Sequence, residues 1–145
     1  MLAGLGRWLR AAGYDTEVAE GAARDRALVD RAAAEGRIFL TRDRSVPQLK
    51  TAAPVWVLPT GGADDDAKAL ASRGVDWTVA PFTRCLVDNT PLETATPQDM
   101  LRMPEESRLM QGPHRVCPNC RRVYWPGSHV RRMRAQLERW AAGSS

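Results

Sequence analysis

The chain has 145 residues, a formal net charge of +4, and 43% hydrophobic and 26% charged residues. This balance excludes an intrinsically disordered chain, and the length suits one domain or a small domain with an appended module. No apolar segment reaches the roughly 20 residues needed to cross a bilayer, and the first residues lack a signal-peptide pattern. We therefore expect a cytoplasmic protein without a membrane partner.

Basic residues are concentrated near the C-terminus. Residues 112–145 contain seven arginines and one acidic residue, Glu138, so this segment is strongly positive. A basic segment favours a polyanionic partner, with nucleic acid the first hypothesis, because guanidinium groups bind phosphate and stack on bases. A GC-rich genome also produces an arginine bias, so composition leaves both explanations open.

The first half of the chain alternates helix and strand patterns, which is typical of an α/β fold. Leu2, Leu5 and Leu9 recur at helical spacing, and Gly13 is a suitable C-terminal cap for that helix. The predicted elements are helices over 2–12, 25–36 and 64–73, a loop over 20–24, and strands over 14–19, 37–40 and 55–58.

Two aspartates are expected at one edge of this sheet. Asp43 follows the strand predicted over 37–40, and Asp25 follows the strand predicted over 14–19 and opens the next helix. A strand, helix and strand in so few residues imply a right-handed parallel crossover, which places both carboxylates at the edge where α/β sheets bind ligands. Such a pair would form an oxygen-ligand site for a divalent cation. Asp25 is equally suited to capping the helix.

Three consecutive aspartates, 64–66, begin the third predicted helix. Acidic residues in the first turn stabilise the helix dipole, so we interpret this trio as capping in preference to metal binding.

The character of the chain changes at about residue 80, which predicts a domain over 1–78 and a separate module over 79–145. A last helix is expected from Ser128, as its cap, to Trp140. Its arginines are either solvated or contact nucleic acid, and Tyr124 and Trp125 beside it are either core residues or stacking platforms for bases.

A cysteine pattern marks this second module. Cys117 and Cys120 have two residues between them, one of which is a proline, and this pattern is typical of a zinc knuckle. The other knuckle would be Cys85 and Asp88, with aspartate where cysteine is usual. Three alternatives stay open, namely zinc held by these four residues, zinc completed by His114 or water, and no zinc. An odd number of cysteines argues against a disulfide framework.

Several motifs occur in a specific order. They are L-G-R-W-L-R-A-A-G-Y-D-T at 5–16, L-T-R-D at 40–43, F-T-R-C at 82–85, N-x-x-L at 89–92, C-P-N-C at 117–120, Y-W-P-G-S-H at 124–129 and R-M at 132–133. With these motifs the chain resembles the Mut-seven C-terminal ribonuclease family over nearly its whole length. In that family a PIN-like nuclease domain is joined to a zinc ribbon.

The resemblance implies an α/β fold with a PIN-like parallel sheet and flanking helices, followed by a small C-terminal zinc-ribbon-like module. It implies a metal-dependent ribonuclease, in which Mg²⁺ or Mn²⁺ held by Asp43 and Asp25 activates water and neutralises the scissile phosphate of RNA. The candidate substrate-binding residues, taken from the motifs and from the basic last helix, are Arg7, Arg10, Arg42, Arg131 and Arg132. The implied ligands of structural Zn²⁺ are Cys85, Asp88, Cys117 and Cys120.

The sequence departs from the family pattern at its start. PIN-like nucleases carry another aspartate at the end of a strand that precedes the first helix, whereas this sequence begins at that helix. We therefore expect the sheet to lack a central strand and the metal site to lack one ligand. PIN-like folds often pair, which makes a homodimer a candidate assembly.

Two other functions fit the same sequence. One is a non-catalytic RNA-binding module that uses the basic ribbon, and the other is a regulatory, protein-binding relative of PIN toxins. An RNA-binding module would show salt-sensitive affinity for RNA, whereas a protein-binding relative would not.

Overall fold

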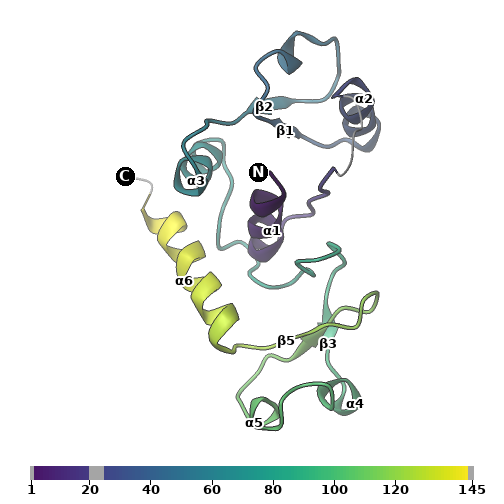
Figure 1. Ribbon diagram of the computed structural model, residues 1–145, viewed down its shortest axis with the longest axis vertical. Helices are drawn as coiled ribbons and strands as arrows, with labels where there is room; N and C mark the ends of the chain where they lie inside the picture. The colour runs from purple at the N-terminus through teal and green to yellow at the C-terminus, as the bar shows by residue number, and fades with distance from the viewer. Residues whose placement is uncertain (1, 20–24, 144–145) are drawn as a thin grey trace.

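The computed structural model describes residues 2–19 and 25–143 (Figure 1). This part of the chain is a mixed α/β protein with a small parallel sheet. Its helices are α1 (Leu2–Ala12), α2 (Asp25–Glu35), α3 (Ala63–Ser72), α4 (Pro97–Met100), α5 (Glu105–Arg108) and α6 (Ser128–Ala142), with a 3₁₀ turn η1 (Val46–Gln48). Its strands are β1 (Phe39–Thr41), β2 (Val55–Val57), β3 (Glu93–Thr94), β4 (Arg115–Val116) and β5 (Val123–Tyr124). Every helix in the described residues is too short or too polar to span a bilayer.

The strands form two separate sheets. β1 and β2 pair in parallel, with Phe39 opposite Val55, and the N–H of Leu58 extends the ladder by donating to the Thr41 carbonyl at 2.7 Å. β3, β4 and β5 form an antiparallel sheet in the order β3-β4-β5. The strand predicted over 37–40 is shifted by the structure to 39–41, and Ile38 before it is 46% exposed.

The prediction of a strand over 14–19 is wrong. This segment belongs to no strand in the described residues, and side chains bind its backbone instead. The Arg10 Nε donates to the Thr16 carbonyl at 2.8 Å, and the Thr16 N–H donates to Asn89 Oδ1 at 2.9 Å. The apolar residue Val18 packs on α1, where a Cβ at Gly6 would lie 2.5 Å from Val18 Cγ2. The loop predicted over 20–24 lies outside the described residues.

The C-terminal end of helix α1 contacts the segment that follows α3. Gly13 has a φ of +107°, which favours glycine, and a Cβ there would lie 2.5 Å from the Ala80 carbonyl oxygen. The N–H groups of Ala80 and Phe82 donate to the carbonyls of Ala12 and Ala11 at 3.0 and 2.8 Å. These bonds satisfy carbonyls at the helix end that have no partner within the helix.

One hydrophobic core joins α1, α3 and α6 (Figure 1). Trp77 is fully buried at its centre and donates its indole N–H to the Ala67 carbonyl at 3.0 Å. Trp140 of α6 packs against Trp8 of α1 and against Trp77, with ring centroids 4.9 and 5.0 Å apart. The core contains residues from both sides of the boundary predicted between 78 and 79, so the two segments share their apolar packing.

The helix predictions agree with the structure except at two N-termini. α6 begins at Ser128 with Gly127 as its N-cap and no side-chain cap, so the prediction that Ser128 caps it is wrong. α3 has Gly62 as its N-cap, also without a side-chain cap. Two of the three acidic residues in the first turn of α3 bind elsewhere, since Asp64 accepts from the Trp140 indole at 2.9 Å and Asp66 pairs with Arg42.

We expect Leu137→Ala to lower the free energy of unfolding by about 2–5 kcal/mol, because Leu137 is fully buried in the shared core. Urea denaturation should show one transition at a lower midpoint, as both segments depend on the same core. Glu138→Ala, on the exposed face of the same helix, is the matched control. Two separate transitions, with only one shifted by Leu137→Ala, would show instead that the segments fold independently.

Candidate functional site

Asp43 lies two residues beyond the C-terminal end of β1, and its orientation is fixed locally. Its Oδ1 accepts hydrogen bonds from the N–H and the hydroxyl of Ser45 at 2.8 and 2.7 Å. Its own N–H donates to the buried hydroxyl of Thr41 at 3.1 Å. The Ser45 hydroxyl and N–H hold the pKa of Asp43 below its ordinary value. Asp43 is therefore ionised at neutral pH.

Asp25 lies close enough to Asp43 for its side chain to act on the pKa of Asp43. Asp25 is the first residue of α2, and the chain turns at Gly36 before entering β1. Both carboxylates are exposed. Exposed carboxylate oxygens with room for water and phosphate fit the preference of Mg²⁺ or Mn²⁺.

Arg42, the residue before Asp43, is bound within the protein. Its Nη1 and Nη2 donate to the two carboxylate oxygens of Asp66 at 2.9 and 2.8 Å, and Nη1 also donates to the Pro59 carbonyl. The Asp66 side chain is only 3% exposed. The pairing of Asp66 with Arg42 was not apparent from the sequence, because a run of three aspartates at the start of a helix is typical of capping.

Arg7 and Arg10 of α1 have different surroundings. Arg10 binds three backbone carbonyls, those of Thr16, Leu86 and Val87, at 2.8 to 3.2 Å. Its guanidinium therefore connects α1 to the segment over 14–19 and to residues 86–87. Arg7 is exposed and lies 3.2 Å from Nε2 of His129, in the first turn of α6. The contact brings Arg7 to the N-terminal end of the basic helix.

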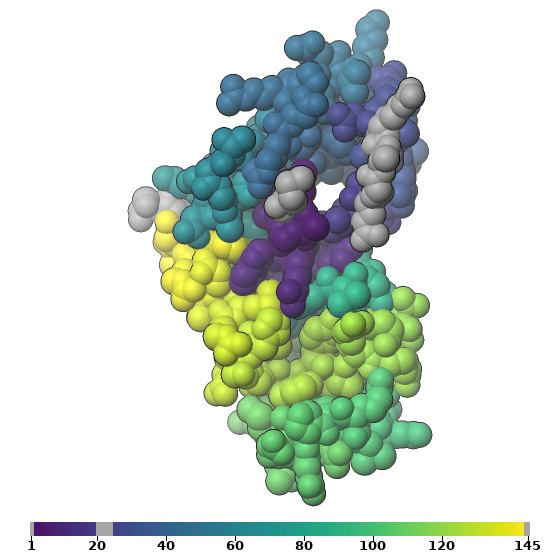
Figure 2. All heavy atoms as spheres, viewed as in Figure 1, coloured from purple at the N-terminus to yellow at the C-terminus, as the bar shows by residue number. Residues whose placement is uncertain are grey.

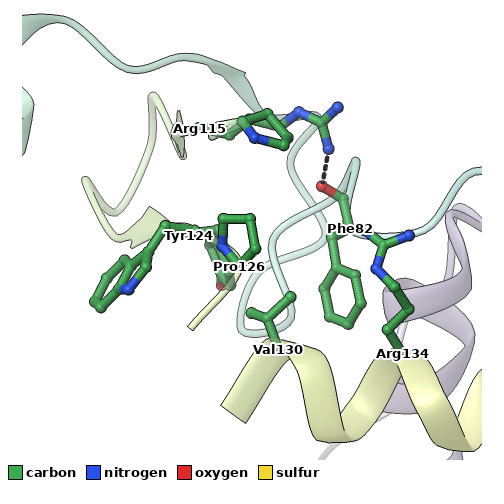
Figure 3. A pocket seen from close by; sticks show the side chains of 8 residues that line it. Phe82, Arg115, Tyr124, Pro126, Val130 and Arg134 are labelled. Carbon is green, nitrogen blue, oxygen red and sulfur yellow. Dashed lines mark hydrogen bonds between the residues drawn. The ribbon is translucent and has the colours of Figure 1, made fainter. Parts of the chain in front are cut away.

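Helix α6 lies at the surface beside α1 (Figure 2). Arg131 and Arg132 are exposed, and their side chains make no ion pair or hydrogen bond with the described residues. Arg134 instead lies over the Phe82 ring at 5.5 Å, and Arg115 donates to the Phe82 carbonyl at 2.8 Å (Figure 3). Phe82 thereby joins the antiparallel sheet to α6, and Arg134 is a packing residue.

Four candidate zinc ligands converge in the structure. One ligand atom from each of Cys85, Asp88, Cys117 and Cys120 lies within 4.8 Å of the others. The Sγ atoms of Cys85 and Cys120 are 3.6 Å apart, close to the separation of about 3.8 Å that Zn–S bonds of about 2.3 Å give in a tetrahedral site. The donor set and its spacing therefore fit Zn²⁺. His114 lies outside the cluster, with its Nε2 3.4 Å from the Ser107 carbonyl.

Neighbouring groups orient these ligands. Asp88 accepts from the Asn119 amide at 2.9 Å and from the Thr90 N–H at 3.0 Å, and these bonds outweigh its burial and lower its pKa. Burial raises the pKa of the Cys85 thiol to about 11. The Tyr124 hydroxyl lies 3.2 Å from Cys85 Sγ and accepts the Leu86 N–H at 3.0 Å, so Tyr124 supports the cluster.

A polar network connects the cysteine cluster to the segment over 14–19. The side chain of Asn89, which has a φ of +72°, donates to Asp15 at 2.7 Å while accepting the Thr16 N–H. Arg37, just before β1, binds the same Asp15 carboxylate at 3.2 Å. Asn89 was visible in the sequence only as part of a motif, and its contact with Asp15, 74 residues away, depends on the tertiary fold.

A small parallel sheet with an acidic edge and a cysteine cluster define a mixed α/β protein with two candidate metal centres. The family model of the Mut7-C RNAse domain matches residues 1–137. The chain therefore belongs to the Mut7-C RNAse domain family, which confirms the resemblance and indicates a ribonuclease-like function with RNA as substrate. Comparison with curated proteins and with solved structures gives no match.

We expect the chain to bind one zinc ion, and Asp88→Asn to weaken this binding by more than about tenfold, because an amide oxygen is a poorer ligand than a carboxylate. Competition with a chromophoric chelator measures the affinity, and the spectrum of the Co²⁺-substituted chain reports thiolate coordination. Asp30→Asn, on the exposed face of α2, is the control. Equal zinc affinities in the wild type and Asp88→Asn would show that Asp88 is not a ligand.

A second prediction concerns stability in acid. The N–H and hydroxyl of Thr96 hold the pKa of Asp99 below its ordinary value, with Arg121 contributing. A carboxyl group with a lowered folded-state pKa stabilises the fold above its unfolded pKa of about 3.9, and that stabilisation is lost as pH falls through the folded pKa. The free energy of unfolding should therefore fall below about pH 4, and less steeply in Asp99→Asn. Urea titrations from pH 7 to 2 test this, and an unchanged slope would contradict it.

Proposed function

We propose that the chain is a metal-dependent ribonuclease with a PIN-like α/β fold, and that Asp25 and Asp43 form its hydrolytic site. The observation that carries this proposal is the exposed carboxylate of Asp43, which Ser45 orients just beyond the C-terminal end of β1, with Asp25 of α2 close enough to influence it. Family membership supports RNA as the substrate. The position of the pair agrees with the general location of ligands at the carboxyl ends of parallel strands.

Asp25 and Asp43 would hold Mg²⁺ or Mn²⁺, and such a cation lowers the pKa of bound water and neutralises charge on a phosphodiester. The protein fixes the geometry of this site through Asp43. Its carboxylate is ionised and oriented by Ser45, while Thr41 holds its backbone. An oriented, ionised carboxylate needs little reorganisation when substrate arrives.

Arg7, Arg131 and Arg132 are the arginines that we assign to the RNA backbone. All three are exposed, and the contact of Arg7 with His129 places α1 beside the start of α6. Their guanidinium groups can bind phosphate oxygens in pairs. Arg10 and Arg42 are engaged with backbone carbonyls and with Asp66, so we assign them a structural role.

We further propose that residues 79–145 form a zinc-ribbon-like module in which Cys85, Asp88, Cys117 and Cys120 hold a structural zinc. The closed set of four ligands, which leaves no position for water, supports a structural role over a catalytic one. The module would present α6 to RNA.

Asp43→Asn is the test of the hydrolytic site. We expect the wild type to cleave labelled single-stranded RNA with Mn²⁺ or Mg²⁺ and not with EDTA, and the variant to lose at least about 100-fold in kcat while retaining RNA affinity. Asn keeps the shape and removes the charge. Asp30→Asn serves as the matched control. RNA binding without cleavage in the wild type would contradict the proposal and favour a non-catalytic binding module.

Arg131→Ala combined with Arg132→Ala tests the RNA-binding surface. Each phosphate contact contributes about 0.7 to the slope of log affinity against log salt for single strands, so we expect a weaker affinity and a slope smaller by about 1–1.5. Fluorescence anisotropy with labelled RNA at several salt concentrations measures both. Lys68→Ala, at an exposed position of α3, controls for the loss of a positive charge. An unchanged slope would remove α6 from the RNA-binding surface.

A further inference from the structure

An ion pair between a buried carboxylate and a partly exposed arginine lies next to Asp43 in the chain. Asp66, in the first turn of α3, is 2% exposed and binds Arg42 through both carboxylate oxygens. Asp64 and Asp65 in the same turn are exposed. Burying one aspartate of a surface trio is costly unless it is paired, and the two-pronged contact supplies that pairing. The pair therefore fixes Arg42 in one orientation.

Arg42 is next in the chain to Asp43, the candidate catalytic carboxylate. It follows Thr41, whose hydroxyl accepts the Asp43 N–H, and it precedes Asp43 itself. It also donates to the carbonyl of Pro59, just beyond β2. One guanidinium thus ties the end of β1, the end of β2 and the first turn of α3 together.

The ion pair also controls the charge next to Asp43. Asp66 neutralises Arg42, the cation that precedes Asp43, with a carboxylate oxygen 2.8 Å from Arg42 Nη2. Arg44, which follows Asp43, is exposed. Without Asp66, the Arg42 guanidinium would be free to turn towards the neighbouring carboxylates of Asp43 and Asp25. Arginine bound to those carboxylates would compete with a divalent cation for the same oxygens.

We propose that Asp66, acting through Arg42, is a positioning residue that holds Asp43 ready for a divalent cation and keeps Arg42 away from it. This inference rests on the proposed function. Arg42 then supports the metal site and does not bind the RNA phosphate. Asp66, the buried aspartate in the first turn of α3, then contributes to metal affinity.

The test is Mn²⁺ binding to the full, zinc-loaded chain, measured by electron paramagnetic resonance in Asp66→Asn. We expect the dissociation constant for Mn²⁺ to rise about tenfold, as is usual when a group that orients a ligand is lost. In RNA cleavage kcat should fall while KM for RNA changes little. Asp65→Asn, one residue away and exposed, should match the wild type in both measurements.

A double-mutant cycle with Arg42→Gln shows whether Asp66 acts through Arg42. The double variant should bind Mn²⁺ no more weakly than Asp66→Asn alone, because Asp66 acts through Arg42 and the double variant has no guanidinium left to compete for the carboxylates. Additive losses would overturn the proposal. Arg42→Lys keeps the charge but cannot make the two-pronged contact, so it gives the same comparison if Asp66→Asn does not fold.

The outcomes separate this inference from the proposed function. If the wild type binds Mn²⁺ and cleaves RNA, but Asp66→Asn loses only thermal stability and keeps its Mn²⁺ affinity, the ion pair is merely structural and the inference is wrong. If the wild type neither binds Mn²⁺ nor cleaves RNA, the proposed function fails and the inference fails with it.

Discussion

The packing of α6 against α1 and α3 is the constraint on which the rest of the structure depends. The helix comes from the end of the chain, yet Val130, Met133 and Leu137 are buried in the same core as Leu5 and Leu9 of α1. An isolated three-residue parallel pair such as β1 and β2 buries too little apolar surface to be stable alone. The three helices and the buried Trp77 supply that missing burial, so the acidic edge depends on contacts made by the C-terminal helix.

Around this core, hydrogen bonds from polar side chains connect segments that backbone hydrogen bonds would connect in a larger sheet. Arg10 and Asn89 bind the segment over 14–19, and Arg42 connects two strand ends to α3. Every buried side-chain nitrogen and oxygen in the described residues has a hydrogen-bond partner. Arginine suits this task because one guanidinium can reach several carbonyls or carboxylates from different segments. The arginine-rich composition thus reflects internal structure as well as a basic surface.

The two candidate metal centres differ in how they are built. Asp25 and Asp43 are exposed, with one of them fixed by hydrogen bonds from an adjacent serine. The cysteine cluster is largely enclosed, and its aspartate is held by Asn119 and Thr90. An open pair of carboxylates leaves room for water and substrate, whereas a closed set of four ligands stabilises a fold. This contrast supports one catalytic and one structural role.

Local pattern determined the helices, the two apolar strands near 39 and 55, and the residue types at both candidate centres. Helical spacing, a terminal glycine and the spacing of the cysteines are all short-range signals, and the ordered motifs identified the family. The strand predicted over 14–19 failed because alternation of apolar residues shows only that one face is buried, and here that face packs on α1 with Gly6 beneath Val18. Nothing in a local pattern distinguishes a helix surface from a neighbouring strand as the partner.

Tertiary structure alone decided which charged residues are available. Arg7, Arg10 and Arg42 are equivalent in the sequence, but only Arg7 is exposed, while the other two are bound to partners 6 to 77 residues away. Asp64, Asp65 and Asp66 differ in the same way, because only the third faces inward. Burial and pairing of a charge depend on what the rest of the chain places beside it. The sequence by itself therefore determined which chemical groups this protein has, and the fold determined which of them can meet a metal or RNA.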